Sequence, residues 1–138
     1  MEDKKTVIII EDDKDIAELL KYNLEKIGVD SLLAYDGEEG LRLLKENLPD
    51  LIILDLMLPK IDGYEILANI KENIVLSDVP VIILSAKTNP GAIVKGFRMG
   101  AIDYFPKPFQ VGELVLRVKN LLADKNSVND GEYHATVG

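Results

Sequence analysis

Residues 51–63 read LIILDLMLPKIDG. The first four are branched apolar residues that do not alternate with polar ones, which predicts a strand covered on both faces, as in a parallel sheet. Asp55 follows at the carboxyl end of this strand. Pro59 then redirects the chain, and Gly63 can adopt backbone conformations that other residues avoid. We therefore expect a shaped loop with an acidic residue at the edge of a parallel sheet.

Apolar runs of the same kind occupy residues 7–10 and 81–84. Weaker patterns predict two more strands, at residues 31–35 and 103–105. Between the strands, apolar residues recur at helical spacing. The expected helices include residues 16–27, 63–72, 92–99 and 111–122. Because strands and helices alternate, we predict the α/β class, with a flavodoxin-like, doubly wound parallel sheet of five strands and helices on both faces.

Polar residues mark several boundaries of these elements. Asp13 can cap the first helix and Gly28 can end it, because short polar side chains bind free helical N–H groups and glycine accepts the conformation that ends a helix. Asp36 and Glu39 have the spacing of a capping box and predict a further helix after them. Pro106 cannot donate a hydrogen bond to a sheet, so the fifth strand should lie at an edge.

Acidic residues follow two of the predicted strands. Glu11 and Asp12 come after the first run, and Asp55 comes after the run at residues 51–54. Taken alone, the first cluster is most simply a solvated strand end. The three carboxylates together would suit Mg²⁺, with Mn²⁺ as a substitute, because Mg²⁺ prefers oxygen ligands. They can share one metal only if the first and third strands are neighbours, which favours strand order 2-1-3-4-5.

Two further polar residues lie at strand ends. Ser85 ends the fourth strand, where a hydroxyl can be structural or can bind a ligand. Lys107 stands between Pro106 and Pro108, which stiffen the backbone and aim its ammonium group; the alternative is an exposed loop lysine. Carboxyl ends of parallel strands meet at one edge of the sheet, so these groups can form one pocket for a divalent metal and a phosphoryl group.

Composition sets the outer limits of function. The chain has 138 residues, 47% of them hydrophobic, and a formal net charge of −8. We expect one domain at residues 1–123, followed by a polar tail or linker at residues 124–138.

The acidic balance argues against binding to nucleic acid or to an anionic membrane. Without cysteine there are no disulfides or thiolate metal sites. The short apolar run near the start is no signal peptide, so we expect a cytoplasmic protein.

The five spaced residues Glu11, Asp12, Asp55, Ser85 and Lys107 resemble the receiver domain of two-component response regulators. The resemblance runs from about residue 6 to residue 123. It implies that Asp55 accepts a phosphoryl group from the phosphohistidine of a histidine kinase or a histidine phosphotransfer protein. It also implies assistance from Lys107 and Ser85. The implied Mg²⁺ ligands are Asp12, Asp55, the backbone carbonyl of Met57 and, through water, Glu11.

The same resemblance implies how the signal is passed on. Tyr104 would be a switch residue that turns inward when Ser85 approaches the phosphoryl group, and Lys107–Pro108 would be a cis peptide. The output face would comprise the fourth helix, the fifth strand and the fifth helix, and it would bind a second copy or another protein. Ile93 and Ile102 stand there where charged residues are expected, although Asp103 and Arg117 can still pair.

A departure from the family pattern concerns the start of the fourth helix. Residues 88–91 read TNPG where an acidic run is usual, so we expect a shortened or mobile first turn.

Three other functions fit part of the pattern. A haloacid-dehalogenase-type phosphatase needs a second aspartate where this chain has Met57. A flavin binder needs a phosphate-binding loop after the first strand, where acidic residues would repel phosphate. A degenerate receiver that only binds proteins is the alternative that stays open, although such modules typically lose site residues and all five are present here. We therefore expect a signalling phosphoacceptor that is no enzyme beyond its own phosphorylation and dephosphorylation.

Overall fold

Strands and helices alternate along residues 4–127, the part of the chain that the computed structural model describes. The elements are β1 Thr6–Ile10, α1 Lys14–Glu25, β2 Asp30–Ala34, α2 Gly37–Glu46, β3 Leu51–Leu54, α3 Gly63–Glu72, β4 Val81–Ser85, α4 Pro90–Arg98, β5 Asp103–Pro106 and α5 Val111–Ser127. The predicted α/β class is confirmed. Within residues 4–127, no helix combines the length and apolar character needed to cross a membrane.

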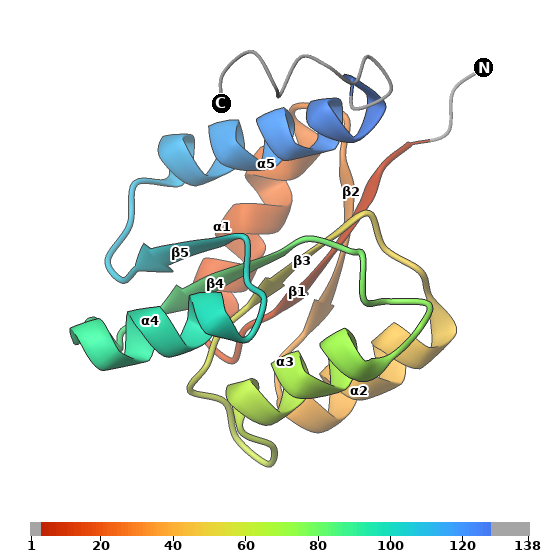
Figure 1. Ribbon diagram of the computed structural model, residues 1–138. Coiled ribbons are helices and arrows are strands. Elements are labelled where there is room, and N and C mark those ends of the chain that lie inside the picture. Colours follow the sequence, from red (N-terminus) through yellow and green to blue (C-terminus); the bar gives the residue numbers. More distant parts are fainter. Residues whose placement is uncertain (1–3, 128–138) are drawn as a thin grey trace.

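The five strands form one parallel sheet in the order β2-β1-β3-β4-β5, as predicted, and β5 is an edge strand. Helices α1 and α5 cover one face, and α2, α3 and α4 cover the other (Figure 1). Side chains of β1 alternate between the two cores: Val7 and Ile9 pack with α1 and α5, whereas Ile8 and Ile10 pack with α2 and α3. Burial on both faces explains the continuous apolar runs.

Helices α1 to α4 begin with a polar cap at the carboxyl edge of the sheet. The caps are Asp13, Asp36, Asp62 and Asn89, and each side chain accepts a hydrogen bond from a backbone N–H of the first turn. These bonds satisfy N–H groups that have no partner within the helix. The caps therefore fix the loops that lead from the strands into the helices, which are the loops around the candidate site.

The capping box at α2 differs in detail from the prediction. Asp36 accepts from the Glu39 N–H at 2.7 Å, as expected. Glu39 reaches back to the Tyr35 N–H at 3.0 Å, one residue before the cap. Gly28 follows α1 with φ of 81° and bonds to the Glu25 carbonyl, so it ends that helix as predicted.

Three predicted boundaries are corrected. Strand β2 lies one residue earlier than expected, because its register pairs Asp30 with Thr6 of β1. Helix α4 begins at Pro90, so its first turn is complete; Asn89 caps it and proline is well suited to the first helical position. Helix α5 continues to Ser127, four residues into the segment predicted as a tail. Residues 128–138 of that segment lie outside the described residues, and the domain boundary after residue 123 stays a prediction.

Candidate functional site

The predicted site residues all lie at the carboxyl edge of the sheet. Glu11 and Asp12 follow β1, Asp55 follows β3, Ser85 ends β4 and Lys107 follows β5. Glu11, Asp55 and Ser85 are buried, Lys107 is partly buried and Asp12 is exposed. The adjacency of β1 and β3 brings the acidic residues of the two strands together, as the predicted strand order requires.

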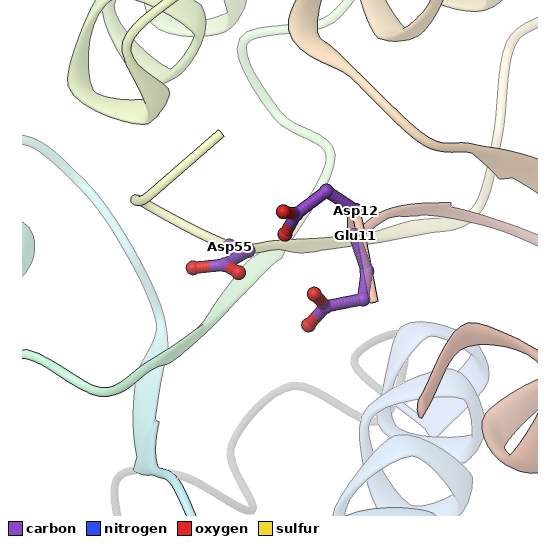
Figure 2. A group of neighbouring side chains, drawn as sticks. All are labelled: Glu11, Asp12 and Asp55. Atoms are coloured by element: carbon purple, nitrogen blue, oxygen red, sulfur yellow. The ribbon is translucent and has the colours of Figure 1, made fainter. Parts of the chain in front are cut away.

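Three carboxylates converge at this edge. Glu11, Asp12 and Asp55 each offer an oxygen atom, and these atoms lie within 4.8 Å of one another. Figure 2 shows that the side chains of Glu11 and Asp12, which are consecutive residues, both extend toward Asp55. Like charges at this separation repel one another unless a cation or a proton is shared between them. The arrangement therefore favours a bound cation.

Lys107 supplies one such cation. Its Nζ atom donates a hydrogen bond to Asp55 Oδ2 at 2.9 Å and lies 2.7 Å from Glu11 Oε1. Its backbone N–H donates to the Ser85 carbonyl at 2.9 Å, which holds the residue beside β4. The Lys107–Pro108 peptide is cis, as predicted. The lysine is thus no free loop residue, because its side chain is directed at the two buried carboxylates.

The buried charges shift the pKa values of this pair. Burial is the largest influence on Glu11 and raises its pKa from 4.5 to about 7, although the adjacent Lys107 ammonium and the hydrogen bond from the Asp13 N–H act in the opposite direction. Burial alone would lower the pKa of Lys107, but its ion pair with Glu11 and its hydrogen bond to Asp55 outweigh this and raise it. Lys107 therefore stays charged near neutral pH, while Glu11 can hold a proton there.

The donor set fits a hard divalent ion. Glu11 Oε1 is buried and makes no hydrogen bond of good geometry, although the Lys107 ammonium lies close to it. No hydrogen bond or ion pair holds the Asp12 carboxylate within residues 4–127, so it is free to turn toward a ligand. Asp55 Oδ1 accepts from the Met57 N–H at 2.9 Å, which places Met57 beside the carboxylates. Oxygen donors of this kind suit Mg²⁺.

Ser85 and Tyr104 meet at the segment that follows β4. Ser85 Oγ accepts from the Lys87 N–H at 3.1 Å. The Tyr104 hydroxyl donates to the Lys87 carbonyl at 2.6 Å, and Tyr104 as a whole is 8% exposed. Tyr104 therefore occupies the inward position expected of the phosphorylated state. Both residues contact the same peptide segment, which links Ser85, at the edge of the sheet, with the Tyr104 ring.

The loop after Asp55 is fixed by close packing at Gly63. Its N–H donates to the Leu56 carbonyl at 3.1 Å. A Cβ atom on Gly63 would lie 2.4 Å from Leu56 Cα, so no other residue fits without moving the loop. The glycine was noted in the sequence for its conformational freedom, but the structure shows that the requirement is space. Neighbouring Tyr64 cannot be singled out from the sequence, because a single aromatic residue in a helix gives no specific signal.

Comparisons with known proteins identify the family to which the chain belongs. The family model of the response regulator receiver domain matches residues 7–119. The chain is 41% identical over 118 residues to the alkaline phosphatase synthesis transcriptional regulatory protein PhoP of Bacillus subtilis (strain 168), covering 86% of this chain and 48% of that protein. It is 39% identical over 129 residues to a probable transcriptional regulator, ycf27, of Porphyridium aerugineum, covering 92% of this chain and 52% of that protein.

The chain thus spans about half the length of the curated relatives that it matches. Among solved structures, the receiver domain of the Francisella response regulator 1452 superposes with a TM-score of 0.83 at 36% identity, covering 88% of this chain and 99% of that one. Sequence and fold therefore agree over nearly all of the described residues. The chain belongs to the receiver domain family of two-component response regulators, in which phosphorylation on an aspartate and dependence on Mg²⁺ are general.

Proposed function

We propose that Asp55 is the phosphoacceptor of this receiver. Receiver domains interact with histidine kinases or phosphotransfer proteins, and we place the exchange in the cytoplasm, as for other response regulators. The observation that carries the proposal is the position of the Asp55 carboxylate. It is buried, hydrogen-bonded to Lys107 at 2.9 Å and grouped with the carboxylates of Glu11 and Asp12.

The proposed reaction is an in-line displacement. An oxygen of Asp55 attacks the phosphorus atom of the donor phosphohistidine, the P–N bond breaks, and its electron pair stays on the imidazole nitrogen. The Lys107 ammonium and the Ser85 hydroxyl take up charge on the phosphoryl oxygens. Asp12, Asp55, the Met57 carbonyl and, through water, Glu11 would hold Mg²⁺ or Mn²⁺, which supplies further positive charge to these oxygens. Hydrolysis of the acyl phosphate by water at the same site would reset the receiver.

Metal removal provides the test of this function. With Mg²⁺ and acetyl phosphate, the wild type should gain the mass of one phosphoryl group, and EDTA should abolish the gain. Asp12→Ala removes a carboxylate ligand and should lower labelling by about tenfold or more, because Mg²⁺ is usually held by only one or two carboxylates. Intact-mass measurement and Mg²⁺ titration check both results.

Asp13→Asn is the matched control for Asp12→Ala. Asn caps a helix as well as Asp does, and Asp13 is committed to the N–H groups of α1, so this variant should label like the wild type. Labelling in EDTA would contradict the proposed role of the metal. Unchanged Mg²⁺ affinity in Asp12→Ala would move the ligand role to Glu11 or Asp13.

We propose that Ser85 and Tyr104 pass the signal to α4. When the Ser85 hydroxyl turns to a phosphoryl oxygen, it exchanges its bond with the Lys87 N–H for a stronger, charge-assisted bond. The segment around Lys87 then packs against the inward Tyr104, whose hydroxyl bonds to the Lys87 carbonyl. Helix α4 lies directly on this ring, since a Cβ atom on Gly96 would be 3.2 Å from it. A change at Tyr104 therefore reaches the face formed by α4, β5 and α5.

The proposed output face differs from the expectation at one residue. Ile93 is partly buried and packs against the core, whereas Ile102 is 43% exposed, as expected. Leu116 of α5 is 57% exposed. Arg117 and Asp103 form the predicted pair at 2.8 Å and so tie α5 to β5. Exposed apolar side chains around an ion pair suit a contact with a second copy or another protein.

Sedimentation tests the homodimer version of this contact. If α4, β5 and α5 form the interface, beryllofluoride with Mg²⁺ should make the wild type dimerise, and Ile102→Asp with Leu116→Asp should stay monomeric because two charges would be buried. Leu19→Asp, an equally exposed residue on α1, is the control and should dimerise like the wild type. A wild type that stays monomeric in both states excludes self-association.

A further inference from the structure

Tyr64, in the first turn of α3, contacts the segment that leads into α4. Its hydroxyl donates to the Ala92 carbonyl at 3.3 Å. Two ammonium groups lie over its ring: Lys95 Nζ is 4.0 Å and Lys87 Nζ is 5.2 Å from the ring centroid. Both distances are within the range of cation–π attraction. Helices α3 and α4 therefore share a bonded contact on the same face of the sheet (Figure 1).

On its other side, Tyr64 adjoins the loop between β3 and α3, residues 55–62, which we call the phosphoacceptor loop. Tyr64 directly follows Gly63, which is packed against the backbone of Leu56, the residue after Asp55. The Tyr64 N–H also donates to the cap Asp62 at 3.0 Å. A displacement of the backbone beside Asp55 must therefore move the start of α3 or be resisted by it. Because the ring is partly buried against the core, Tyr64 moves with the helix start.

The segment of Lys87 is thus held from two sides. Tyr104 of β5 bonds its carbonyl, while Tyr64 of α3 contacts the Lys87 ammonium and, five residues on, the Ala92 carbonyl. Ser85 contacts the same segment from the site itself. Two routes therefore lead from the site to α4. One runs through Ser85 and Tyr104, and the other runs through the phosphoacceptor loop and α3.

We propose that Tyr64 is a positioning residue that couples the phosphoacceptor loop to α4, through its bond with Ala92 and its contacts with Lys87 and Lys95. The proposal rests on Asp55 being the phosphoacceptor. Tyr64 is not among the residues proposed to hold the phosphoryl group or the metal, so its loss should separate two properties: phosphoryl uptake should remain, and the response of α4 should weaken.

Paired measurements on each variant test this coupling. One is the rate of Asp55 labelling by acetyl phosphate, and the other is the slowing of amide exchange in α4 on addition of beryllofluoride with Mg²⁺. Tyr64→Leu and Lys95→Met should keep labelling within about twofold of the wild type, while the exchange effect falls by about threefold or more. Lys95→Arg keeps a cation over the ring and should restore the effect. Tyr64→Phe keeps the ring and should lose less than Tyr64→Leu.

Lys26→Met is the matched control, because Lys26 lies 5.3 Å from the Tyr22 ring centroid on α1, a similar contact away from α4. It should leave both measurements unchanged. A wild-type exchange effect in Tyr64→Leu and Lys95→Met overturns the coupling. Labelling that falls together with the exchange effect in the exposed Lys95→Met also overturns it, since the residues would then act on the site itself. A wild type that takes up no phosphoryl group instead overturns the role of Asp55.

Discussion

Asp55→Asn should take up no phosphoryl group from acetyl phosphate under conditions that label the wild type fully. The amide has no anionic oxygen to attack phosphorus. The substitution keeps the volume of the side chain, and the Asn carbonyl can still accept from the Met57 N–H. Loss of labelling would thus reflect the lost nucleophile rather than a collapsed loop. Intact-mass measurement gives the result directly.

Asp62→Asn is the control, since Asp62 lies in the same loop but is exposed and serves only to cap α3. Asn retains the cap, so this variant should label like the wild type. Equal labelling of Asp55→Asn and the wild type would remove Asp55 as the acceptor. A phosphoryl group found on Asp12 or Glu11 in the Asp55 variant would point to a substitute acceptor in the same pocket.

The central strands could be predicted closely, because burial on both faces leaves a continuous apolar run in the sequence. Residues 51–54 are strand β3 as predicted. The edge strand β2 was displaced by one residue, since its limits depend on pairing with β1, which no local pattern reveals. Helix α5 continues to Ser127, past the last apolar residue at helical spacing, because polar residues can extend a helix without an apolar pattern that would predict it.

The site was predictable for a related reason. Parallel strands bring their carboxyl ends to one edge, so residues that follow the strands must meet there. That reasoning gave the grouping of Asp55 with Glu11 and Asp12, which the structure bears out. It did not give the 2.7 Å approach of Lys107 to Glu11, nor the contact of Tyr64 with α4. Such contacts depend on how each helix is rotated and where each side chain points, which spacing along the chain does not encode.

Lys107→Ala should abolish the response to beryllofluoride near Tyr104 while Mg²⁺ still binds. The substitution removes the ammonium group that attracts the phosphoryl oxygens, but the proposed metal ligands remain. Chemical-shift changes around Tyr104 and a Mg²⁺ titration separate the two effects. Ser85→Ala should show a milder loss, because it removes one neutral hydroxyl. If both variants respond like the wild type, the proposed switch is wrong.

The same variant should also be less stable without metal. Removing Lys107 leaves the buried carboxylates of Glu11 and Asp55 without their shared cation, which should cost about 1–3 kcal/mol of unfolding free energy. Lys60→Ala is the matched control: this exposed lysine also lies near two carboxylates, those of Asp36 and Glu38, and its loss should cost about 0.5 kcal/mol or less. Urea unfolding in EDTA measures both.

The pH dependence of unfolding free energy in Lys107→Ala tests whether the lost stability comes from the ion pair with Glu11. Burial raises the pKa of Glu11 to about 7, so the folded state binds a proton that the unfolded state releases, and stability falls as pH rises from about 4.5 to about 7. Lys107 holds this pKa down, so in Lys107→Ala it should rise further and stability should keep falling above pH 7. Between about pH 6 and about pH 8, Lys107→Ala should therefore lose more unfolding free energy than the wild type. Equal slopes would mean that Lys107 does not neutralise Glu11 in the folded protein.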